Sequence, residues 1–476
     1  AAWRGGTGPC CACAWGAAVS EGGGRPKTDL GRTCPGTPQP PQTSLSLLLR
    51  DSPNPQPCPF PLPWGPPQTS DVSSNPPAFP GALIPRCSPQ NPTPGLSTWS
   101  GNLSSFGVAP SLSSFLQTCW CRARWRLSVR RWSGTGGTGW GAPPVTWELR
   151  SHGEAPLDPF EVFTFHTCST IARLLFGDLV PPPGELRAFS CCLGELLQVW
   201  GHSSVRALDL LPLLRALPNP GLRKLLQLVQ HRDTFVEAQI QRHQACPSPP
   251  PDTVLGALLG RNSGARGGPL SPPRLHMALV DLFIGGTETT AAALGWAVAF
   301  LLHRPELQAR LRAELEGAQG PPGPGDMGRL PLLQATVSET LRLRPPAPLA
   351  LPHCALRHTS LGGLPVVAGT VLVPNLLAAQ QDPDIWQHPE VFLPERFLAP
   401  GAPSRSLLPF GCGARSCPGE GLARAELFVF LGLILREFRL EPGPGGLPGL
   451  KGSPGTVLRC PPFRLRMVPC QPLGSP

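Results

Sequence analysis

The ten residues FGCGARSCPG, at positions 410–419, constrain the fold of this chain more than any other stretch. A phenylalanine, two glycines and Arg415 precede Cys417 at fixed offsets, and Gly419 follows two residues later. A buried structural cysteine requires none of these neighbours. A metal-ligating thiolate does, because N–H groups at a helix start favour the ionised sulfur and glycines let the backbone approach it. The stretch therefore predicts a metal-binding cysteine before a helix, rather than a chance cysteine in a glycine-rich loop.

The neighbours of Cys417 have separate roles in this interpretation. Gly411, Gly413 and Gly419 supply the loop conformation that brings backbone N–H groups round the sulfur. Arg415 is placed to neutralise an anionic edge of a cofactor. Phe410 is placed to pack against the ligand and exclude water.

Composition divides the chain into two parts near residue 140. The chain contains 66 prolines and 54 glycines, far above ordinary usage, and the prolines are concentrated early. Residues 1–140 lack helical or strand periodicity, so we expect an extended or disordered segment of uncertain fold. Residues 141–470 have the patterning of a folded domain.

Helical periodicity dominates this second part, and the small strands are confined to its later half. We expect strands within 361–375, a proline-rich meander at 382–400 and a surface loop at 246–274. The expected helices cover residues 162–178, 213–244, 274–304, 330–345 and 418–437. On the second of these helices, the apolar residues near one face are Leu222, Leu225, Leu226, Val229, Val236 and Ile240. The fold class expected is mainly α with a small β component.

Cysteine usage and charge exclude several classes of protein. The 17 cysteines are odd in number and irregularly spaced, so we expect most to be free and reduced. The cluster Cys10-Cys11-Ala-Cys13 has no paired cluster to complete a zinc site. No apolar run long enough to span a membrane is expected, and no signal peptide is recognisable. The net charge of +10 favours an acidic protein or an anionic membrane surface, and no basic aromatic cluster indicates nucleic acid.

The stretch GGTETT, residues 285–290, lies within the expected apolar helix 274–304. Each glycine costs a helix about 1 kcal/mol relative to alanine, so the pair requires a reason. One reading is a local opening where a small ligand meets the backbone, with Glu288 and Thr289 delivering protons through water. The other is a kinked core helix whose threonine hydroxyls bond back to carbonyl groups. The residues alone favour neither.

Glu339 and Arg342 form a third motif on the helix expected at 330–345. Residues at i and i+3 share a helix face and can pair. Because the surrounding residues are apolar, we expect this pair to be buried, and a buried pair requires further partners. Arg396, within Pro394-Glu-Arg-Phe397, is the partner we expect.

Each motif occurs once, and in this order the set resembles the cytochrome P450 family, the haem-thiolate monooxygenases. The resemblance covers about residues 141–468 and implies a cytochrome P450 fold with an atypical N-terminal third. Within the family the chain most resembles the vertebrate steroid 21-hydroxylases. The stretches that carry this resemblance are LPNPGLRKLLQ, HMALVDLFIGGTETTA, LRLRPPAPLALPH and FGCGARSCPGEGLARAELFVF.

The resemblance implies a haem b cofactor with Cys417 as the axial ligand of its iron. It also implies that Glu288 and Thr289 deliver protons during oxygen activation, and that the carboxylates of haem meet Arg415 and His353. The implied haem-binding residues are Cys417, Arg415, His353, Phe410, Gly411 and Gly419, with Trp120 and Arg124 matching a further haem contact by spacing alone. The implied structural ionic network is Glu339, Arg342 and Arg396.

The implied reaction is C21 hydroxylation of progesterone and 17-hydroxyprogesterone at the endoplasmic reticulum membrane. Electrons would come from NADPH through a separate partner, the NADPH-cytochrome P450 reductase. The implied substrate contacts are Arg232, Asp281, Leu282, Gly286, Pro346 and Ala347. Three alternatives stay open: an impaired haem-binding relative without an intact N-terminal third, a monooxygenase acting on another steroid position, and a cysteine-rich metal-binding interaction protein.

Overall fold

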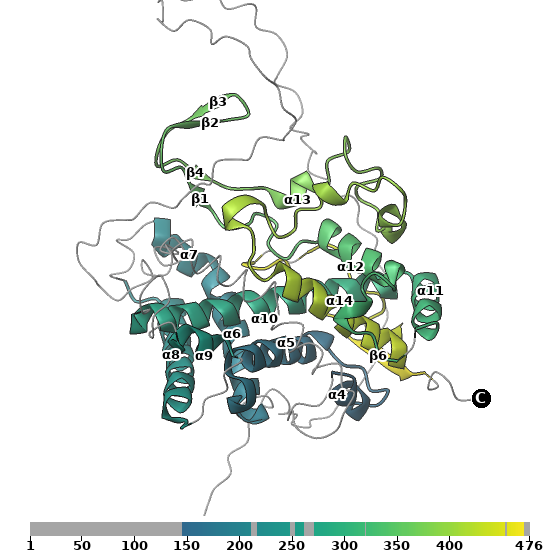
Figure 1. Cartoon of the computed structure of the whole chain (residues 1–476), viewed down its shortest axis with the longest axis horizontal. Coiled ribbons are helices and arrows are strands. Elements are labelled where there is room, and N and C mark those ends of the chain that lie inside the picture. Colours follow the sequence, from purple (N-terminus) through teal and green to yellow (C-terminus); the bar gives the residue numbers. More distant parts are fainter. Residues whose placement is uncertain are drawn as a thin grey trace, which may run out of the picture. The chain divides into compact units, whose positions relative to one another are not determined.

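The computed structural model describes residues 145–210, 217–247, 253–260, 271–318, 320–452 and 455–470. Within these ranges helices predominate and the strands form small two-stranded sheets (Figure 1). The predicted fold class, mainly α with a small β component, is confirmed. Trp120, Arg124 and the cluster at 10–13 lie outside the described residues.

The helices follow one another with short connections, and prolines mark many of their starts. Pro159, Pro183, Pro220, Pro272, Pro305 and Pro331 each stand at a first helical position, where the missing N–H costs nothing. The helices are α4 (Val145–Ser151), α5 (Pro159–Phe176), α6 (Pro183–Gly201), α7 (Ser203–Leu210), α8 (Pro220–Ala245), α9 (Val254–Gly260), α10 (Pro272–Leu302), α11 (Pro305–Glu316), α12 (Pro331–Leu343), α13 (Leu376–Ala379) and α14 (Glu420–Glu437).

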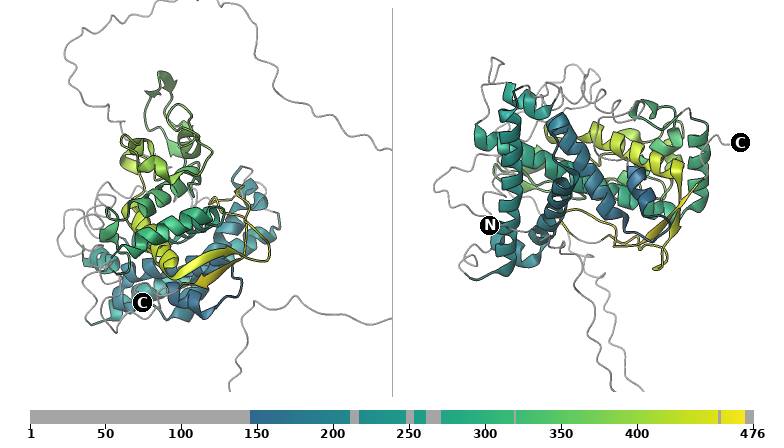
Figure 2. Two further views of the ribbon diagram at one scale, coloured as in Figure 1. Left: turned by 90° about the vertical axis from the view of Figure 1, so that its right-hand side faces the viewer. Right: turned by 90° about the horizontal axis from the view of Figure 1, so that it is seen from below.

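Three antiparallel strand pairs complete the described residues. They are β1 (His353–Cys354) with β4 (Val371–Leu372), β2 (Thr359–Leu361) with β3 (Leu364–Val366), and β5 (Phe438–Pro442) with β6 (Leu465–Pro469). The β5–β6 pair packs its apolar face on the helical core. The hairpin of β2 and β3 instead stands away from the helices, as Figures 1 and 2 show.

Helix α10 is the central element of the core. Its second half, from Thr290 to Leu302, is buried without interruption, and α5 and α14 pack against it (Figure 1). By length and composition α10 alone among the described helices could cross a membrane, and 61% of its most apolar window is buried inside the protein. The sequence predicts no such segment, because no apolar run reaches the roughly 18 residues of a spanning helix.

Two expectations for the region before α10 are wrong in part. The helix expected at 213–244 begins at Pro220, where Asn219 caps it by accepting from the Leu222 N–H at 3.1 Å. Leu225, Val236 and Ile240 are buried as expected, whereas Leu226 is 47% exposed. The buried face also includes Leu228 and Phe235. The loop expected at 246–274 contains α9, a two-turn helix whose Leu255 and Leu258 are buried.

Candidate functional site

The loop before α14 holds Cys417 by its backbone. The Cys417 N–H donates to the Phe410 carbonyl at 2.9 Å, which closes the loop. Gly411 and Gly413 have φ of 74° and 76°, in the left-handed region that favours glycine. Gly419 has an ordinary φ of −89° and caps α14, so its role is different. A side chain there would lie 3.7 Å from the Cys417 sulfur.

The protein surroundings of Cys417 raise the pKa of its thiol. The residue as a whole is exposed, yet the loop surrounds the sulfur closely enough that desolvation raises the pKa of the thiol. The Gly419 N–H bonds to the sulfur and lowers the pKa, and Glu420 raises it. One of the expected N–H groups, that of Gly419, therefore reaches the sulfur, but it does not outweigh desolvation. A cation bound to the sulfur would have to displace its proton.

Two groups that can carry positive charge lie near one another close to this loop. Arg415 precedes Cys417, and His353 lies on β1. Desolvation lowers the pKa of His353, and the nearby Arg415 charge lowers it further. Neither side chain has an ion-pair partner among the described residues. Phe410 is held by the guanidinium of Arg424, 5.1 Å from the ring centre.

Glu288 is fully buried on α10 and has one charged partner. One carboxylate oxygen accepts from Arg459, in the segment before β6, while the other has no hydrogen-bond partner among the described residues. Desolvation raises the pKa of Glu288, and the charge and hydrogen bond of Arg459 oppose this rise. The sequence analysis missed Arg459, which is 171 positions away and belongs to no motif.

The Thr289 hydroxyl and the Glu288 carboxylate lie on different sides of α10 and have different partners. Its hydroxyl donates to the Gly285 carbonyl at 2.5 Å, which is the back-bonding that the sequence analysis left open. Helix α10 is unbroken here. Asp281, Gly285 and Thr289, spaced four residues apart, form a partly exposed stripe on this otherwise buried helix. Glu288 and Thr289 do not bond to one another, so the water-linked pair stays a prediction.

Gly286 lies where α10 meets α5. A Cβ atom at this position would come within 2.4 Å of Cδ1 and 2.7 Å of Cγ1 of Ile171. A glycine is therefore required for the close helix approach. Gly285 has nothing within 4 Å of the corresponding position. The two adjacent glycines thus serve different purposes, and only Gly285 opens the helix surface.

The substrate residues predicted on α8 and α10 are electrostatically linked. Arg232 is buried and pairs with Asp233 at 2.6 Å, and Asp233 also contacts His276 of α10 at 3.1 Å. Burial raises the pKa of Asp281 to about 7, and the Arg232 charge opposes that rise. Leu282 is half-buried next to Asp281.

The predicted substrate loop after α12 is tied to the C-terminal segment. Pro346 is buried, and its carbonyl accepts from the Leu458 N–H at 2.9 Å. The Leu458 carbonyl accepts from Trp296 Nε1 of α10 at 2.9 Å. Ala347 is half-buried beside Pro346. Residues 458 and 459 thus connect the predicted substrate loop with the helix of Glu288.

The structure brings the predicted ionic network together. Arg342 donates to both oxygens of Glu339, at 2.8 and 2.9 Å, and Arg396 donates to Glu339 at 3.1 Å. Glu339 and Arg342 are 0% exposed. The remaining Arg342 donors reach the carbonyl groups of Gln380, Pro389 and Val391. The network therefore fixes the meander of residues 380–397 to α12.

A second buried acid, Glu426 on α14, was not anticipated. Neither of its oxygens has a hydrogen-bond partner among the described residues, and the adjacent Thr170 hydroxyl already donates to the His166 carbonyl at 3.1 Å. Burial raises the pKa of Glu426 to about 8, and Thr170 opposes the rise. Only its polar type within an apolar helix could have indicated it.

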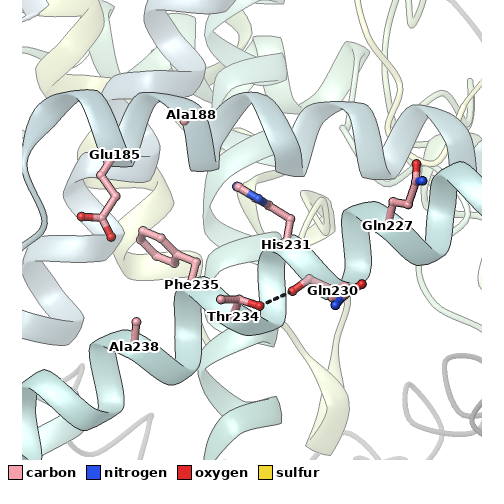
Figure 3. Close-up of a pocket in the computed structure, with 8 residues that line it drawn as sticks. All are labelled: Glu185, Ala188, Gln227, Gln230, His231, Thr234, Phe235 and Ala238. Carbon is pink, nitrogen blue, oxygen red and sulfur yellow. Dashed lines mark hydrogen bonds between the residues drawn. The ribbon is translucent and has the colours of Figure 1, made fainter. Parts of the chain in front are cut away.

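An open cavity of about 510 Å³ lies between α6 and α8 (Figure 3). None of the predicted site residues lines it. Its lining residues are Glu185, Ala188, Gln227, Gln230, His231, Thr234, Phe235 and Ala238. The Thr234 hydroxyl bonds back to the Gln230 carbonyl at 2.9 Å, so it is not directed at a ligand.

Comparison with known proteins identifies relatives over the same part of the chain. The family model described as Cytochrome P450 matches residues 146–467. The steroid 21-hydroxylase of Felis catus is 45% identical over 334 residues, which are 67% of each chain. The steroid 21-hydroxylase of Homo sapiens is 43% identical over the same shares.

Solved structures show the same fold. A zebra fish cytochrome P450 with progesterone superposes with a TM-score of 0.64 at 32% identity, covering 76% of this chain and 81% of that one. Another zebra fish cytochrome P450 structure, with abiraterone, gives a TM-score of 0.59 at 31% identity, covering 75% and 78%.

Proposed function

Because the chain belongs to the cytochrome P450 family, we propose that it hydroxylates carbon 21 of progesterone and 17-hydroxyprogesterone. The family and its 21-hydroxylase relatives make the chain a monooxygenase. The observation that carries the proposed substrate is the 45% identity to a steroid 21-hydroxylase over two-thirds of the chain. The progesterone in a related zebra fish structure supports the steroid class.

The residues near Cys417 fit a haem. The exposed thiol is available to a ligand, and the Gly419 N–H is directed at the sulfur. Arg415 and His353, which have no counter-ion among the described residues, would hold the carboxylates of the porphyrin. When bound, haem supplies the iron that binds and activates dioxygen.

Proton delivery is the proposed role of Glu288 and Thr289. Burial raises the pKa of Glu288, and a buried carboxyl with a raised pKa is suited to hold and release a proton. The Thr289 hydroxyl lies on the partly exposed stripe of α10, where it can exchange its bond to the Gly285 carbonyl for one to water. Water would link the two side chains.

Steroid binding is the proposed role of the linked groups on α8 and α10. Arg232 can donate to a ketone oxygen, and Asp281, with a pKa of about 7, can also donate when neutral. Leu282 and Ala347 offer apolar contacts for the rings, and Pro346 positions that loop. Gly286 would act by allowing α5 to approach rather than by touching the steroid.

The family implies an electron-transfer partner, and we propose the NADPH-cytochrome P450 reductase at the endoplasmic reticulum membrane. The net charge of +10 complements an acidic patch on such a partner. The curated relatives named above support this location by similarity.

The test is the reduced carbon monoxide spectrum of the haem-reconstituted full chain, followed by turnover of progesterone with NADPH and the reductase. We expect the band typical of a thiolate-bound haem and a product carrying one oxygen at carbon 21. The Cys417→Ala variant should lose the band, whereas the control Cys412→Ala, in the same loop and exposed, should keep it. A Cys417→Ala variant with an unchanged band would overturn the proposal.

A second candidate is a haem-binding relative without turnover. The extent of the match favours it, because the similarity to the steroid 21-hydroxylase of Felis catus covers 67% of each chain. It predicts the thiolate band without steroid product. Hydroxylation at another carbon would instead agree with monooxygenase activity and contradict only the proposed position, carbon 21 of the steroid.

A further inference from the structure

Arg232 of α8 is held by the residue that follows it in the sequence. Its Nε donates to Oδ1 of Asp233 at 2.7 Å, and its Nη2 lies 2.6 Å from the same oxygen. Side chains of consecutive residues on a helix do not ordinarily face each other. The Arg232 side chain must therefore turn toward Asp233, so the contact is not a default of helical geometry.

This contact fixes the direction of a long side chain. Arginine has many rotamers, whereas its guanidinium donates hydrogen bonds only within one plane. With Nε and Nη2 against Asp233, the plane and the direction of the remaining N–H groups are set. Burial raises the pKa of Asp281, on the partly exposed stripe of α10, and the Arg232 charge opposes that rise. The guanidinium therefore lies near this stripe.

A histidine on α10 holds Asp233 in turn. Desolvation raises the pKa of Asp233, but the hydrogen bond of His276 and the charge of Arg232 outweigh this effect, and the pKa falls below its usual value. Asp233 is thus an anion at neutral pH and only accepts hydrogen bonds. Nε2 of His276 lies 3.1 Å from Oδ1 of Asp233, so this nitrogen carries the proton of the bond.

Glu237, one turn further along α8, provides a comparison with Asp233. Its Oε2 lies 3.8 Å from Nδ1 of His276, which is beyond hydrogen-bonding distance, and its side chain is 53% exposed. Its Oε1 accepts from Gln241 at 3.2 Å. Glu237 thus brings the same charge to the same histidine without a hydrogen bond between them.

We propose that Asp233 and His276 are positioning residues that set the direction in which Arg232 donates to a ketone of the steroid. This inference rests on the proposed function. Progesterone has ketones at carbons 3 and 20, and the second adjoins carbon 21. The ketone at carbon 3 is therefore the one that can reach a donor away from the site of hydroxylation. Arg232 touches the steroid, and Asp233 and His276 act through Arg232.

Equilibrium dialysis of the haem-reconstituted full chain against progesterone, and against its analogue without the carbon-3 ketone, tests this assignment. The measured quantity is the ratio of the two affinities within one variant, so a lower folded fraction cancels. The wild type should prefer progesterone by roughly tenfold or more, and Asp233→Asn should remove most of that preference, because a misdirected donor loses its bond to the ketone. His276→Leu should reduce the preference roughly threefold. His276→Gln, which keeps an N–H donor, should retain it.

Glu237→Gln is the matched control and should keep the wild-type preference. An Asp233→Asn variant that binds both ligands more weakly by one factor, or that keeps the full preference, overturns the inference, because Asp233 would then have a structural role or none. A control that loses the preference equally also overturns it, since the effect would then be one of general charge. A wild type that binds progesterone without preferring it overturns this inference alone. A wild type that binds neither steroid overturns the proposed substrate as well.

Discussion

Two regions of this molecule differ in how completely their buried charged groups are hydrogen-bonded. Where α12 meets residues 380–397, each guanidinium donor of Arg342 has an acceptor, and Glu339 accepts from two arginines and from the Leu393 N–H. Between α5, α10 and α14, Glu288 and Glu426 are just as buried, yet three of their four oxygens have no hydrogen-bond partner among the described residues.

The difference in pairing distinguishes a buried network with a structural role from buried carboxyl groups that can take part in proton transfer. A fully paired buried network is rigid and fixes one arrangement of the chain. An underpaired buried carboxyl has a raised pKa, as Glu288 and Glu426 do, and is suited to gain and lose a proton. The meander of residues 380–397 is therefore anchored by the first kind, and the proposed proton-delivery helix contains the second kind.

The largest effect should follow from breaking the satisfied network. Arg342→Ala leaves three carbonyl groups and one face of Glu339 without donors, so the free energy of unfolding should fall by about 5 kcal/mol. Urea unfolding measures this loss.

Arg329→Ala is the matched control for that variant. Arg329 pairs with Asp326 at the same spacing of three residues, but its side chain is 69% exposed. Its loss should change stability by no more than about 0.5 kcal/mol. Equal losses from the two variants would show that burial and pairing do not distinguish the α12 network from a surface pair.

The second effect concerns Glu426, whose folded pKa of about 8 lies above the ordinary value of 4.5. Because the folded state binds the extra proton, its stability is full below about pH 4.5 and is lost as pH rises through about 8. Between pH 5 and 8 the wild type should lose on the order of 3 kcal/mol more than Glu426→Gln. Unfolding curves across pH measure the difference. Glu316→Gln, an exposed acid paired with Arg312, should leave the wild-type pH dependence unchanged.

The sequence could anticipate the satisfied region better than the unsatisfied one. Glu339 and Arg342 share a helix face by spacing, and their apolar surroundings demanded a further partner, which the structure shows to include Arg396. The loop of Cys417 was likewise recognisable, because glycine and arginine at fixed offsets restrict the backbone and the charge together.

The unsatisfied region depends on contacts that no local pattern encodes. Arg459 reaches Glu288 from the far end of the chain, and Glu426 meets α5 only through helix packing. No local pattern shows that Gly286 of α10 packs against Ile171 of α5. Helix α9 lies within residues 246–274, whose prolines and glycines predicted a loop, so the sequence pattern did not indicate it.

The third effect separates the two glycines of α10. Gly286→Ala should destabilise the chain by about 2 kcal/mol, because its Cβ would overlap Ile171. Gly285→Ala, with open space at its Cβ, should stabilise it by up to about 1 kcal/mol. Thermal unfolding measures both. Adding Ile171→Ala should reduce the cost of Gly286→Ala, and a cost that stays unchanged would place the overlap elsewhere.

The smallest effect tests whether Arg459 limits the rise in the pKa of Glu288. Removing the guanidinium in Arg459→Gln removes the influences that lower the pKa of Glu288, so that pKa should rise further above 4.5. A raised folded pKa costs stability only as pH rises, so the variant should match the wild type below pH 4.5 and become less stable, by about 1 kcal/mol, as pH rises above it. Arg459→Lys keeps the charge and should follow the wild type, although it loses the stacking on Phe160. In a Glu288→Gln background the loss of Arg459 should have no pH dependence, because the titrating partner is gone. If the pH-dependent loss persists in that background, Arg459 acts through another titrating group. The pairing with Arg459 would then not control the pKa of Glu288, in contrast to the α12 network, where each charged group depends on its partners.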